Sequence, residues 1–224
     1  MKLEQLRGTL IVSCQAPFGS PLNEPLIISA MALTAEQEGA AGVRLNYPAN
    51  IQAARERISI PIIGIEKVVT AGFDVYITPT FAIAENLAQS GSDIIALDAT
   101  RRPRPHNETI ETLIPRIKKA LQRPVMADIA TYEEGLFAAD CGADIVATTL
   151  CGYTAESQGT PLPALNLLEN LAKKLSVPII CEGGVTSPED LRRAFDAGAF
   201  AVVVGTAITG ITQLVQQFVR ATRS

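Results

Sequence analysis

The sequence predicts a closed (β/α)₈ barrel of the TIM type, an α/β fold in a single domain that spans residues 1–224. Two observations predict it. Eight short apolar runs recur along the chain, and a stretch with the pattern of a helix separates each run from the next. The length of 224 residues also suits this fold, because such barrels take about 250 residues and leave little room for a second domain.

The apolar runs are aliphatic or β-branched on both faces, which is typical of parallel strands that are buried on two sides. They are Gly8–Cys14, Gly42–Asn46, Pro61–Lys67, Asp93–Asp98, Pro124–Asp128, Asp144–Thr148, Pro178–Glu182 and Ala201–Gly205. We interpret them as eight parallel strands.

The segments between the runs carry helix signals. Clear examples are Thr109–Leu121, Thr131–Cys141, Leu162–Leu175, Pro188–Ala197 and Ile211–Arg220. Before four of the runs stands a glycine that can end a helix in the left-handed conformation, at Gly39, Gly91, Gly142 and Gly198. Ser187 and Pro188 have the pattern of an N-cap and a first helical position. No linker interrupts the series, which favours a closed barrel over the alternative, an open doubly wound sheet.

Composition limits the class of protein. The net charge of −4 provides no basic surface for nucleic acid, and no apolar stretch reaches the roughly 18 residues that a membrane span needs. The first ten residues do not resemble a signal peptide. The four cysteines lack CxxC spacing, so we expect reduced thiols in a cytoplasmic protein. His106 is the only histidine of the sequence, which disfavours a metal site built on histidines, and we expect neither a metal nor a cofactor.

Nearly every predicted strand ends on polar residues. In a (β/α)₈ barrel the active site lies at these carboxyl ends, where polar side chains cost stability. The ends are Ser13-Cys14-Gln15, Arg44-Leu45-Asn46, Glu66-Lys67, Asp98-Ala99-Thr100, Asp128, Thr148-Thr149, Glu182-Gly183-Gly184 and Gly205-Thr206. So many polar ends together indicate a functional site rather than chance.

The last two strand ends suggest a phosphate site. Gly183, Gly184, Gly205 and Thr206 lie in the two loops that most often bind phosphate in barrels of this type. Glycines let backbone amides approach an anion closely. The alternative is that these glycines only make tight turns.

Lys67 is the candidate base, because a lysine at the mouth of an apolar barrel can have its pKa lowered by desolvation. Taken alone, the favoured interpretation of Lys67 is a solvated lysine of the rim. Glu182 and Asp128 are candidates to orient or polarise a substrate, and Arg44 is a candidate partner for an oxyanion or phosphate.

Several longer blocks resemble the N-acetylmannosamine-6-phosphate 2-epimerase family over essentially the whole chain. The most specific are Ser13-Cys14-Gln15-Ala16 and Thr148-Thr149-Leu150-Cys151-Gly152-Tyr153-Thr154. Others are Gly42-Val43-Arg44, Pro61–Ile65 with Lys67, Tyr76–Thr80, Ala127–Gly135 and Glu182-Gly183-Gly184.

The resemblance implies cofactor-independent proton transfer at carbon 2 of a phosphorylated amino sugar, as in the catabolism of N-acetylmannosamine and sialic acid. The catalytic lysine and its partner carboxylate fall on Lys67 and Glu182. The substrate-binding residues that it implies are Gln15, Arg44, Asp128 and Thr149, and the phosphate-binding residues are Gly183, Gly184, Gly205 and Thr206.

The chain departs from the family pattern in two places. Val68-Val69 replace an Arg-Asp pair, and Gly210 stands where an arginine is common. Two alternatives stay open: another phosphate-binding barrel isomerase that acts on a different sugar phosphate or an anthranilate-type intermediate, and a barrel that binds a sugar phosphate without catalysis.

The final helix-like segment has apolar residues at Ile211, Leu214, Val215, Phe218 and Val219, which is the spacing of one helix face. We expect this face to pack on the chain's own barrel. The alternative is packing on a neighbouring subunit in a homodimer.

Overall fold

The computed structural model describes residues 3–222, and eight parallel strands close into a barrel in the order β1 to β8. The strands are β1 (Thr9–Cys14), β2 (Gly42–Asn46), β3 (Ile62–Ile65), β4 (Ile94–Asp98), β5 (Val125–Asp128), β6 (Ile145–Ala147), β7 (Ile179–Glu182) and β8 (Ala201–Val204). Pairing of Thr9 with Ala201 joins the last strand to the first. The predicted barrel is therefore confirmed, and the open sheet is excluded.

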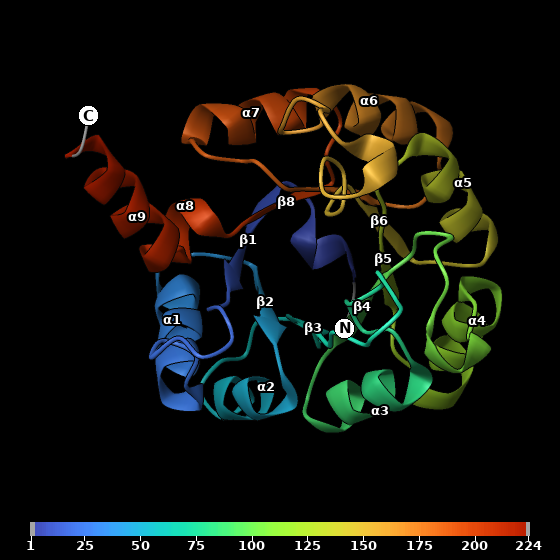
Figure 1. Ribbon diagram of the computed structural model, residues 1–224, viewed down its shortest axis with the longest axis horizontal. Helices are drawn as coiled ribbons and strands as arrows, with labels where there is room; N and C mark the ends of the chain where they lie inside the picture. Colours follow the sequence, from blue (N-terminus) through green and yellow to red (C-terminus); the bar gives the residue numbers. More distant parts are fainter. Residues whose placement is uncertain (1–2, 223–224) are drawn as a thin grey trace.

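Helices surround the strands in sequence order (Figure 1). They are α1 (Pro25–Gln37), α2 (Pro48–Arg55), α3 (Phe81–Gln89), α4 (Ile110–Leu121), α5 (Tyr132–Asp140), α6 (Leu165–Lys174), α7 (Pro188–Asp196), α8 (Thr206–Thr209) and α9 (Ile211–Ala221). Short 3₁₀ turns lie at Leu3–Leu6, Pro105–Asn107 and Ala155–Ser157. No helix of the described residues is both long and apolar enough to cross a membrane.

The strands bury side chains on both faces because successive residues point to opposite sides. Ile63, Ile94 and Ile180 belong to a cluster inside the barrel, while Ile62 and Ile95 belong to a larger cluster between the strands and the helices. Leu6 of the first 3₁₀ turn is fully buried in the inner cluster. The barrel interior is therefore filled and offers no channel.

The predicted helix boundaries follow local chemistry. The Ser187 side chain accepts a hydrogen bond from the Asp190 amide, and Pro188 occupies the first turn of α7. Gly142 and Gly198 have φ of +92° and +96°, so each turns the chain from a helix into the next strand. A residue with a Cβ would be strained there.

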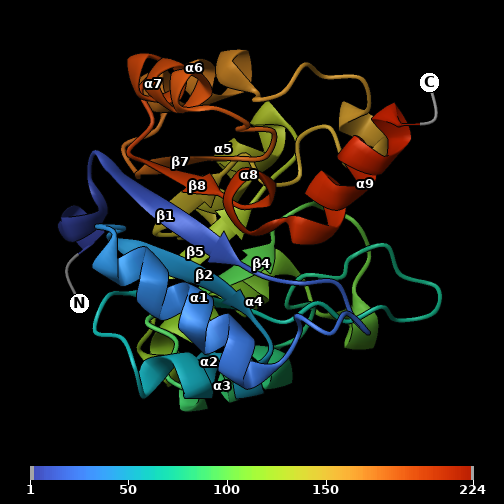
Figure 2. The ribbon, with the colours of Figure 1, turned by 90° about the vertical axis from the view of Figure 1, so that its left-hand side faces the viewer.

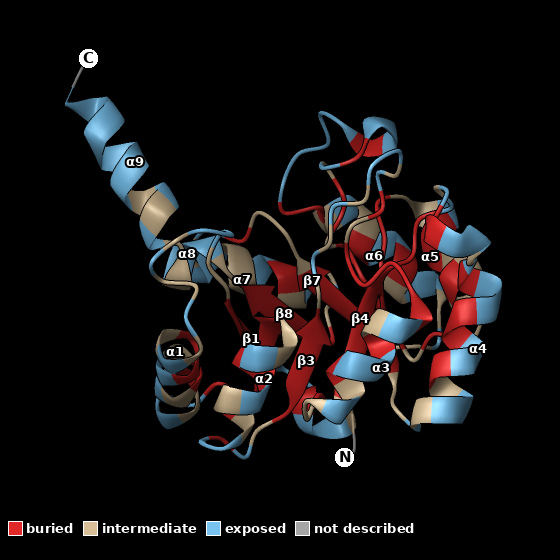
Figure 3. Ribbon diagram, turned by 60° about the horizontal axis from the view of Figure 1, so that its bottom comes forward, coloured by how far each residue is buried: buried red, intermediate tan, exposed pale blue. Residues whose placement is uncertain are grey.

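The last helix does not follow the prediction. α9 projects away from the barrel between α7 and α1, and none of its residues is buried (Figures 1 and 3). Val215 and Phe218 are 54% and 73% exposed. The expectation that this helix packs on its own barrel was wrong, because periodicity shows that a face is apolar but not which surface covers it.

The longest loops gather at the carboxyl ends of the strands, to which the strand arrows point in Figure 2. After β3 the chain forms a narrow hairpin, in which Lys67 pairs with Ile77 as an antiparallel bridge and the Val68 amide donates to the Tyr76 carbonyl at 2.8 Å. These loops form the rim of the mouth.

Candidate active site

The alternation of the strands aims the candidate residues at the barrel axis. In β2, the residues on either side of Arg44 belong to the outer cluster. The residues directly before Asp128 in β5 and before Glu182 in β7 belong to it as well. Arg44, Asp128 and Glu182 therefore share the inward face with residues such as Met126 and Ile180. All three come from different strands and meet because parallel strands of a barrel end at the same rim.

Arg44 joins the two carboxylates. Its guanidinium is 1% exposed and forms a two-pronged ion pair with Asp128, from Nη1 to Oδ1 at 2.9 Å and from Nη2 to Oδ2 at 2.6 Å. Nη1 also donates to Oε2 of Glu182 at 2.8 Å. Two carboxylates and one guanidinium thus form a buried ionic cluster across the mouth, which we call the Arg44 cluster.

Burial shifts the ionisation of this cluster. Desolvation raises the pKa of Glu182 to about 7, and the neighbouring charge of Asp128 adds to this, while Arg44 and Lys67 oppose it. Although burial alone lowers the pKa of Arg44, its two carboxylate partners raise it above the ordinary value. Arg44 therefore stays charged, and Glu182 can gain or lose a proton near neutral pH.

Lys67 stands beside the Arg44 cluster, two residues beyond the end of β3. The Asn46 side chain at the end of β2 accepts a hydrogen bond from its amide at 3.0 Å. Desolvation and the charge of Arg44 lower the pKa of Lys67, whereas Glu182 and Asp128 oppose the change. Its side chain still has an exposed surface at the open mouth, so water limits this lowering in the free protein.

The other predicted binding residues lie around the same cluster. Thr149 donates to Oδ1 of Asp128 at 2.6 Å. Gln15 donates from Nε2 to the Ser13 hydroxyl at 2.7 Å, and its buried Oε1 has no partner in the described chain. The buried Nε of Arg44 also has no hydrogen-bond partner in the described chain. Such atoms favour a ligand, because an unpaired buried polar group is costly.

The two glycine-rich turns lie across β7 and β8. Gly183 and Gly184 have φ of +104° and +72°, which favours glycine, and Gly205 precedes α8 directly. Within residues 3–222, the amides of these glycines and of Thr206 donate no hydrogen bond to the protein. The structure thus brings the four predicted phosphate-binding residues to adjacent turns with free donors.

Gly210 is required by the shape of α8. Its amide closes the turn on the Thr206 carbonyl at 3.1 Å, and a Cβ at this position would stand 2.5 Å from that oxygen. A side chain here therefore displaces the α8 backbone. The departure from the family pattern at this position and the compact form of α8 belong together.

A second polar cluster lies on the β4 side of the mouth, where the sequence indicated the polar end Asp98-Ala99-Thr100 but not its arginine partners. Asp98 is fully buried at the end of β4 and pairs with Arg102 at 2.8 Å and with Arg104 at 3.6 Å. Tyr76 of the hairpin lies against the inner barrel cluster nearby. The inward register of Asp98, two residues after Ala96 of the inner cluster, could have indicated that this carboxylate needs a cationic partner from the loop that follows.

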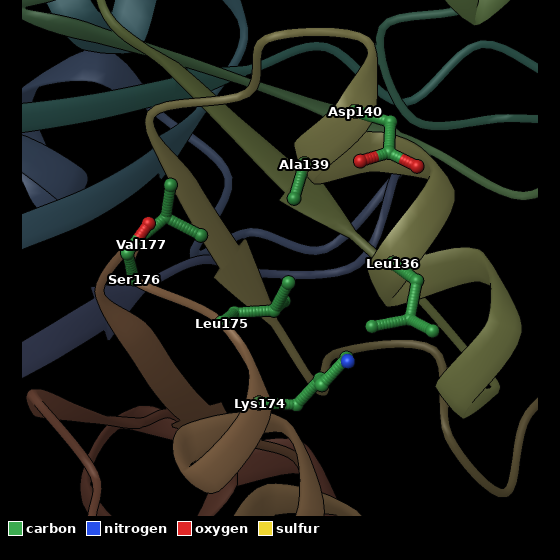
Figure 4. A pocket seen from close by; sticks show the side chains of 7 residues that line it. All are labelled: Leu136, Ala139, Asp140, Lys174, Leu175, Ser176 and Val177. Atoms are coloured by element: carbon green, nitrogen blue, oxygen red, sulfur yellow. The ribbon is translucent and has the colours of Figure 1, made fainter.

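Two further features lie apart from the mouth. A pocket between α5 and the segment that leads into β7 includes Leu136, Asp140 and Lys174 (Figure 4). It is found at the amino-terminal ends of the strands, where conserved chemistry is not expected in this fold. Among the described residues, no group of three or more His, Cys, Asp or Glu is arranged to hold a metal.

A closed parallel barrel whose mouth brings together a lysine, an arginine and carboxylates, beside glycine turns with free amides, defines the class of (β/α)₈-barrel enzymes. A family model described as "Putative N-acetylmannosamine-6-phosphate epimerase" matches residues 28–224. The chain therefore belongs to the N-acetylmannosamine-6-phosphate epimerase family.

Relatives agree with this assignment. Proteins named "Putative N-acetylmannosamine-6-phosphate 2-epimerase" from Synechococcus elongatus and Thermosynechococcus vestitus are 51% and 53% identical over 222 and 220 residues, which cover 98% of this chain and 96% of each relative. The solved structure of the N-acetylmannosamine-6-phosphate 2-epimerase from Clostridium perfringens matches with a TM-score of 0.92 and 41% identity, covering 97% of this chain and 95% of that chain. Thiamine phosphate pyrophosphorylase from Pyrococcus furiosus, at 16% identity and a TM-score of 0.62, shares only the fold.

Proposed function

We propose that this chain interconverts N-acetylmannosamine 6-phosphate and N-acetylglucosamine 6-phosphate by removing and returning the proton on carbon 2. The observation that carries the proposal is the position of Lys67 beside the Arg44 cluster, with both Lys67 and Glu182 shifted toward neutral pKa values. The names of the relatives support the substrate. The reaction belongs to amino-sugar catabolism of the kind that degrades sialic acids.

Lys67 acts as the base. In the open-chain sugar, carbon 2 lies next to the aldehyde, so its proton is acidified. The neutral amine of Lys67 takes this proton, and the electron pair moves onto the aldehyde oxygen to give an enolate. A bound sugar displaces water from the mouth and deepens the lowering of the Lys67 pKa that desolvation begins. Return of the proton to the opposite face gives the other epimer.

Glu182 assists ring opening. Because its pKa is about 7, both of its protonation states are populated near neutral pH. As a carboxylate it can accept the proton of the hydroxyl on carbon 1 while the bond to the ring oxygen breaks, and it can then give this proton to the ring oxygen, which becomes the hydroxyl on carbon 5. The same group can donate a hydrogen bond when it is protonated. No metal or cofactor takes part in this scheme.

Arg44, Asp128, Gln15 and Thr149 position the sugar. The guanidinium of Arg44 remains positive and can stabilise the enolate oxygen, while Asp128 holds the guanidinium in place through two hydrogen bonds. The unpartnered Oε1 of Gln15 accepts from a sugar hydroxyl. Thr149 orients Asp128 through its 2.6 Å hydrogen bond.

The phosphate binds on the free amides of Gly183, Gly184, Gly205 and Thr206. Backbone donors suffice to hold a phosphate in glycine-rich turns, since they lose no side-chain entropy. Because Gly210 stands where an arginine is common, no cationic side chain at this position neutralises the charge of the phosphate. We therefore propose phosphate binding by amides, with a weaker dependence on salt than an arginine site would have.

We also propose that the protein acts as a homodimer in which α9 packs on a second copy. Ile211, Val215, Phe218 and Val219 form one exposed apolar face, and Leu26 of α1 is 76% exposed. A second copy supplies an equivalent apolar surface under two-fold symmetry. Sedimentation velocity of the wild type and of Phe218→Ser should show a dimer and a weakened dimer, with Arg220→Ser as the matched control. A monomeric wild type would refute the dimer.

The chemistry suits the cytoplasm. The four cysteines are free thiols, and acidic residues outnumber basic ones by 23 to 19. Both features fit a protein of a reducing compartment that handles a dissolved sugar phosphate, rather than one that binds nucleic acid or a membrane surface.

Proton NMR in deuterium oxide tests the reaction. The wild type, with N-acetylmannosamine 6-phosphate, should exchange the proton on carbon 2 and form the N-acetylglucosamine epimer. Lys67→Ala should abolish both, whereas Lys119→Ala, which removes an exposed lysine of α4, should not. A wild type that neither exchanges the proton nor forms the epimer would show that this is not the reaction.

A further inference from the structure

The β4 side of the mouth holds a carboxylate that the reaction does not use. Asp98 is fully buried, and its Cα pairs in register with that of Asp128. Its Oδ1 accepts from the Thr100 amide at 2.9 Å and from the Thr100 hydroxyl at 2.7 Å, and its Oδ2 accepts from Arg102 at 2.8 Å. Both oxygens of Asp98 thus accept hydrogen bonds from the protein, and Asp98 holds Thr100 and Arg102 in place.

Hydrogen bonds to Asp98 and Thr100 hold the Arg102 guanidinium in place but occupy only part of its donors. Its Nη2 binds Asp98, and its Nε donates to the Thr100 hydroxyl at 2.9 Å. A guanidinium has five N–H donors. The remaining donors of Arg102 have no partner in residues 3–222, and the side chain is 17% exposed. Arg102 therefore presents oriented, free donors at the rim.

Tyr76 lies on the hairpin next to the bridge between Lys67 and Ile77, and its carbonyl accepts from the Val68 amide at 2.8 Å. Its ring packs against the inner barrel cluster, and its hydroxyl makes no hydrogen bond to the described residues. The charged side chains that influence the hydroxyl are Asp128, Asp98, Arg44 and Arg102. Burial, with the two carboxylates, raises the pKa of Tyr76, while the two arginines oppose this. The hydroxyl thus remains protonated and can donate.

We propose that Tyr76 and Arg102 bind the acetamido group of the substrate, through hydrogen bonds from the Tyr76 hydroxyl and the Arg102 guanidinium to its carbonyl oxygen. This inference rests on the proposed function. In a ring of eight strands, β4 lies opposite β8, where the phosphate is placed. A sugar with its phosphate on the β7 and β8 turns, and its carbon 2 over Lys67, directs the group on carbon 2 toward β4.

The acetamido group and its two proposed partners are complementary in hydrogen bonding. An amide carbonyl accepts hydrogen bonds without carrying a charge, and both partners offered here are donors. Carbon 2 becomes planar when its proton leaves, and the acetamido nitrogen stays in that plane. Two fixed donors on the carbonyl oxygen therefore hold the plane steady while the proton leaves one face and returns to the other.

A comparison of two ligands tests the proposal. Mannose 6-phosphate carries a hydroxyl where the substrate carries the acetamido group, so it serves as a competitive probe that lacks only the group in question. Tyr76→Phe should raise KM for N-acetylmannosamine 6-phosphate about 3- to 10-fold, the effect of one lost hydrogen bond, and leave Ki for mannose 6-phosphate within about 2-fold. Tyr132→Phe on α5 is the matched control and should change neither constant.

Arg102→Lys gives a second measurement, since a lysine keeps the charge next to Asp98 but loses the forked donors. It should also raise KM for the acetamido substrate selectively. The proposal is overturned if Tyr76→Phe changes neither constant, or changes both by the same factor, in an enzyme whose wild type epimerises the substrate. A wild type without any exchange at carbon 2 would instead reject the proposed function itself, and with it this subsite.

Discussion

Removing Arg44 should destabilise the protein in a way that depends on pH. Arg44→Met leaves Asp128 and Glu182 buried without their cation. Loss of one partner from a buried ion pair costs about 3–5 kcal/mol, which corresponds to a fall in Tm of roughly 6–20 °C for a chain of this size.

The pH dependence follows from Glu182. Its folded pKa of about 7 lies above the ordinary value of 4.5, so the folded state binds more protons than the unfolded state in this window. Stability from this group is full below about pH 4.5 and falls as pH rises through 7. Without Arg44, the Glu182 pKa rises further. Between pH 7 and pH 8 the variant should therefore lose up to about 1.4 kcal/mol, whereas the wild type should lose about 0.4 kcal/mol.

Urea denaturation at pH 6 and pH 8 measures both effects. The matched control is Arg192→Met, which removes the exposed arginine from an ion pair of 3.0 Å with Glu189 and should change little at either pH. Equal losses in the two variants, or a loss in Arg44→Met that is the same at both pH values, would refute the reasoning.

Three other changes test neighbouring features. In pH–rate profiles, kcat/KM of the wild type should fall as pH drops below about 7, and Glu182→Gln should remove this inflection. An unchanged profile in the variant would show that the inflection does not come from Glu182. Gly184→Ala should cost about 1–3 kcal/mol more than Gly142→Ala in urea denaturation, because both have positive φ but only a Cβ at Gly184 meets Leu162, at 2.3 Å; equal costs would contradict the contact. Burial raises the pKa of Cys14 to about 12, so a thiol reagent should label half-buried Cys141 before Cys14 in the native protein, and the reverse order would show that the barrel opens readily.

Much of the fold could be predicted from sequence because its causes are local. Each strand is a short apolar run, and every predicted run contains the observed strand, as in Pro178–Glu182 and β7. The convergence of Arg44, Asp128 and Glu182 also followed, because residues at the ends of barrel strands must meet at one rim. The roles of these residues remain predictions.

The other features depend on tertiary contacts, which the periodicity of the sequence does not encode. The hairpin that carries Tyr76 has a single bridge, between Lys67 and Ile77, and no strand-like alternation. The pairing of Asp98 with Arg102 forms within one loop, where the sequence shows charges but not their geometry. The exposure of α9 depends on what packs against it, which the pattern within the helix does not indicate.

Under the proposed mechanism, the Arg44 cluster makes catalysis depend on the completion of folding. Its hydrogen bonds join residues that are 84 and 138 positions apart in the chain, from β2 to β5 and to β7. A chain that has formed only its first half has the arginine and the lysine but not Glu182. Under the proposed mechanism, a folding intermediate with an unclosed barrel is therefore chemically inert, and the first turnover during refolding should mark the moment at which the two halves meet.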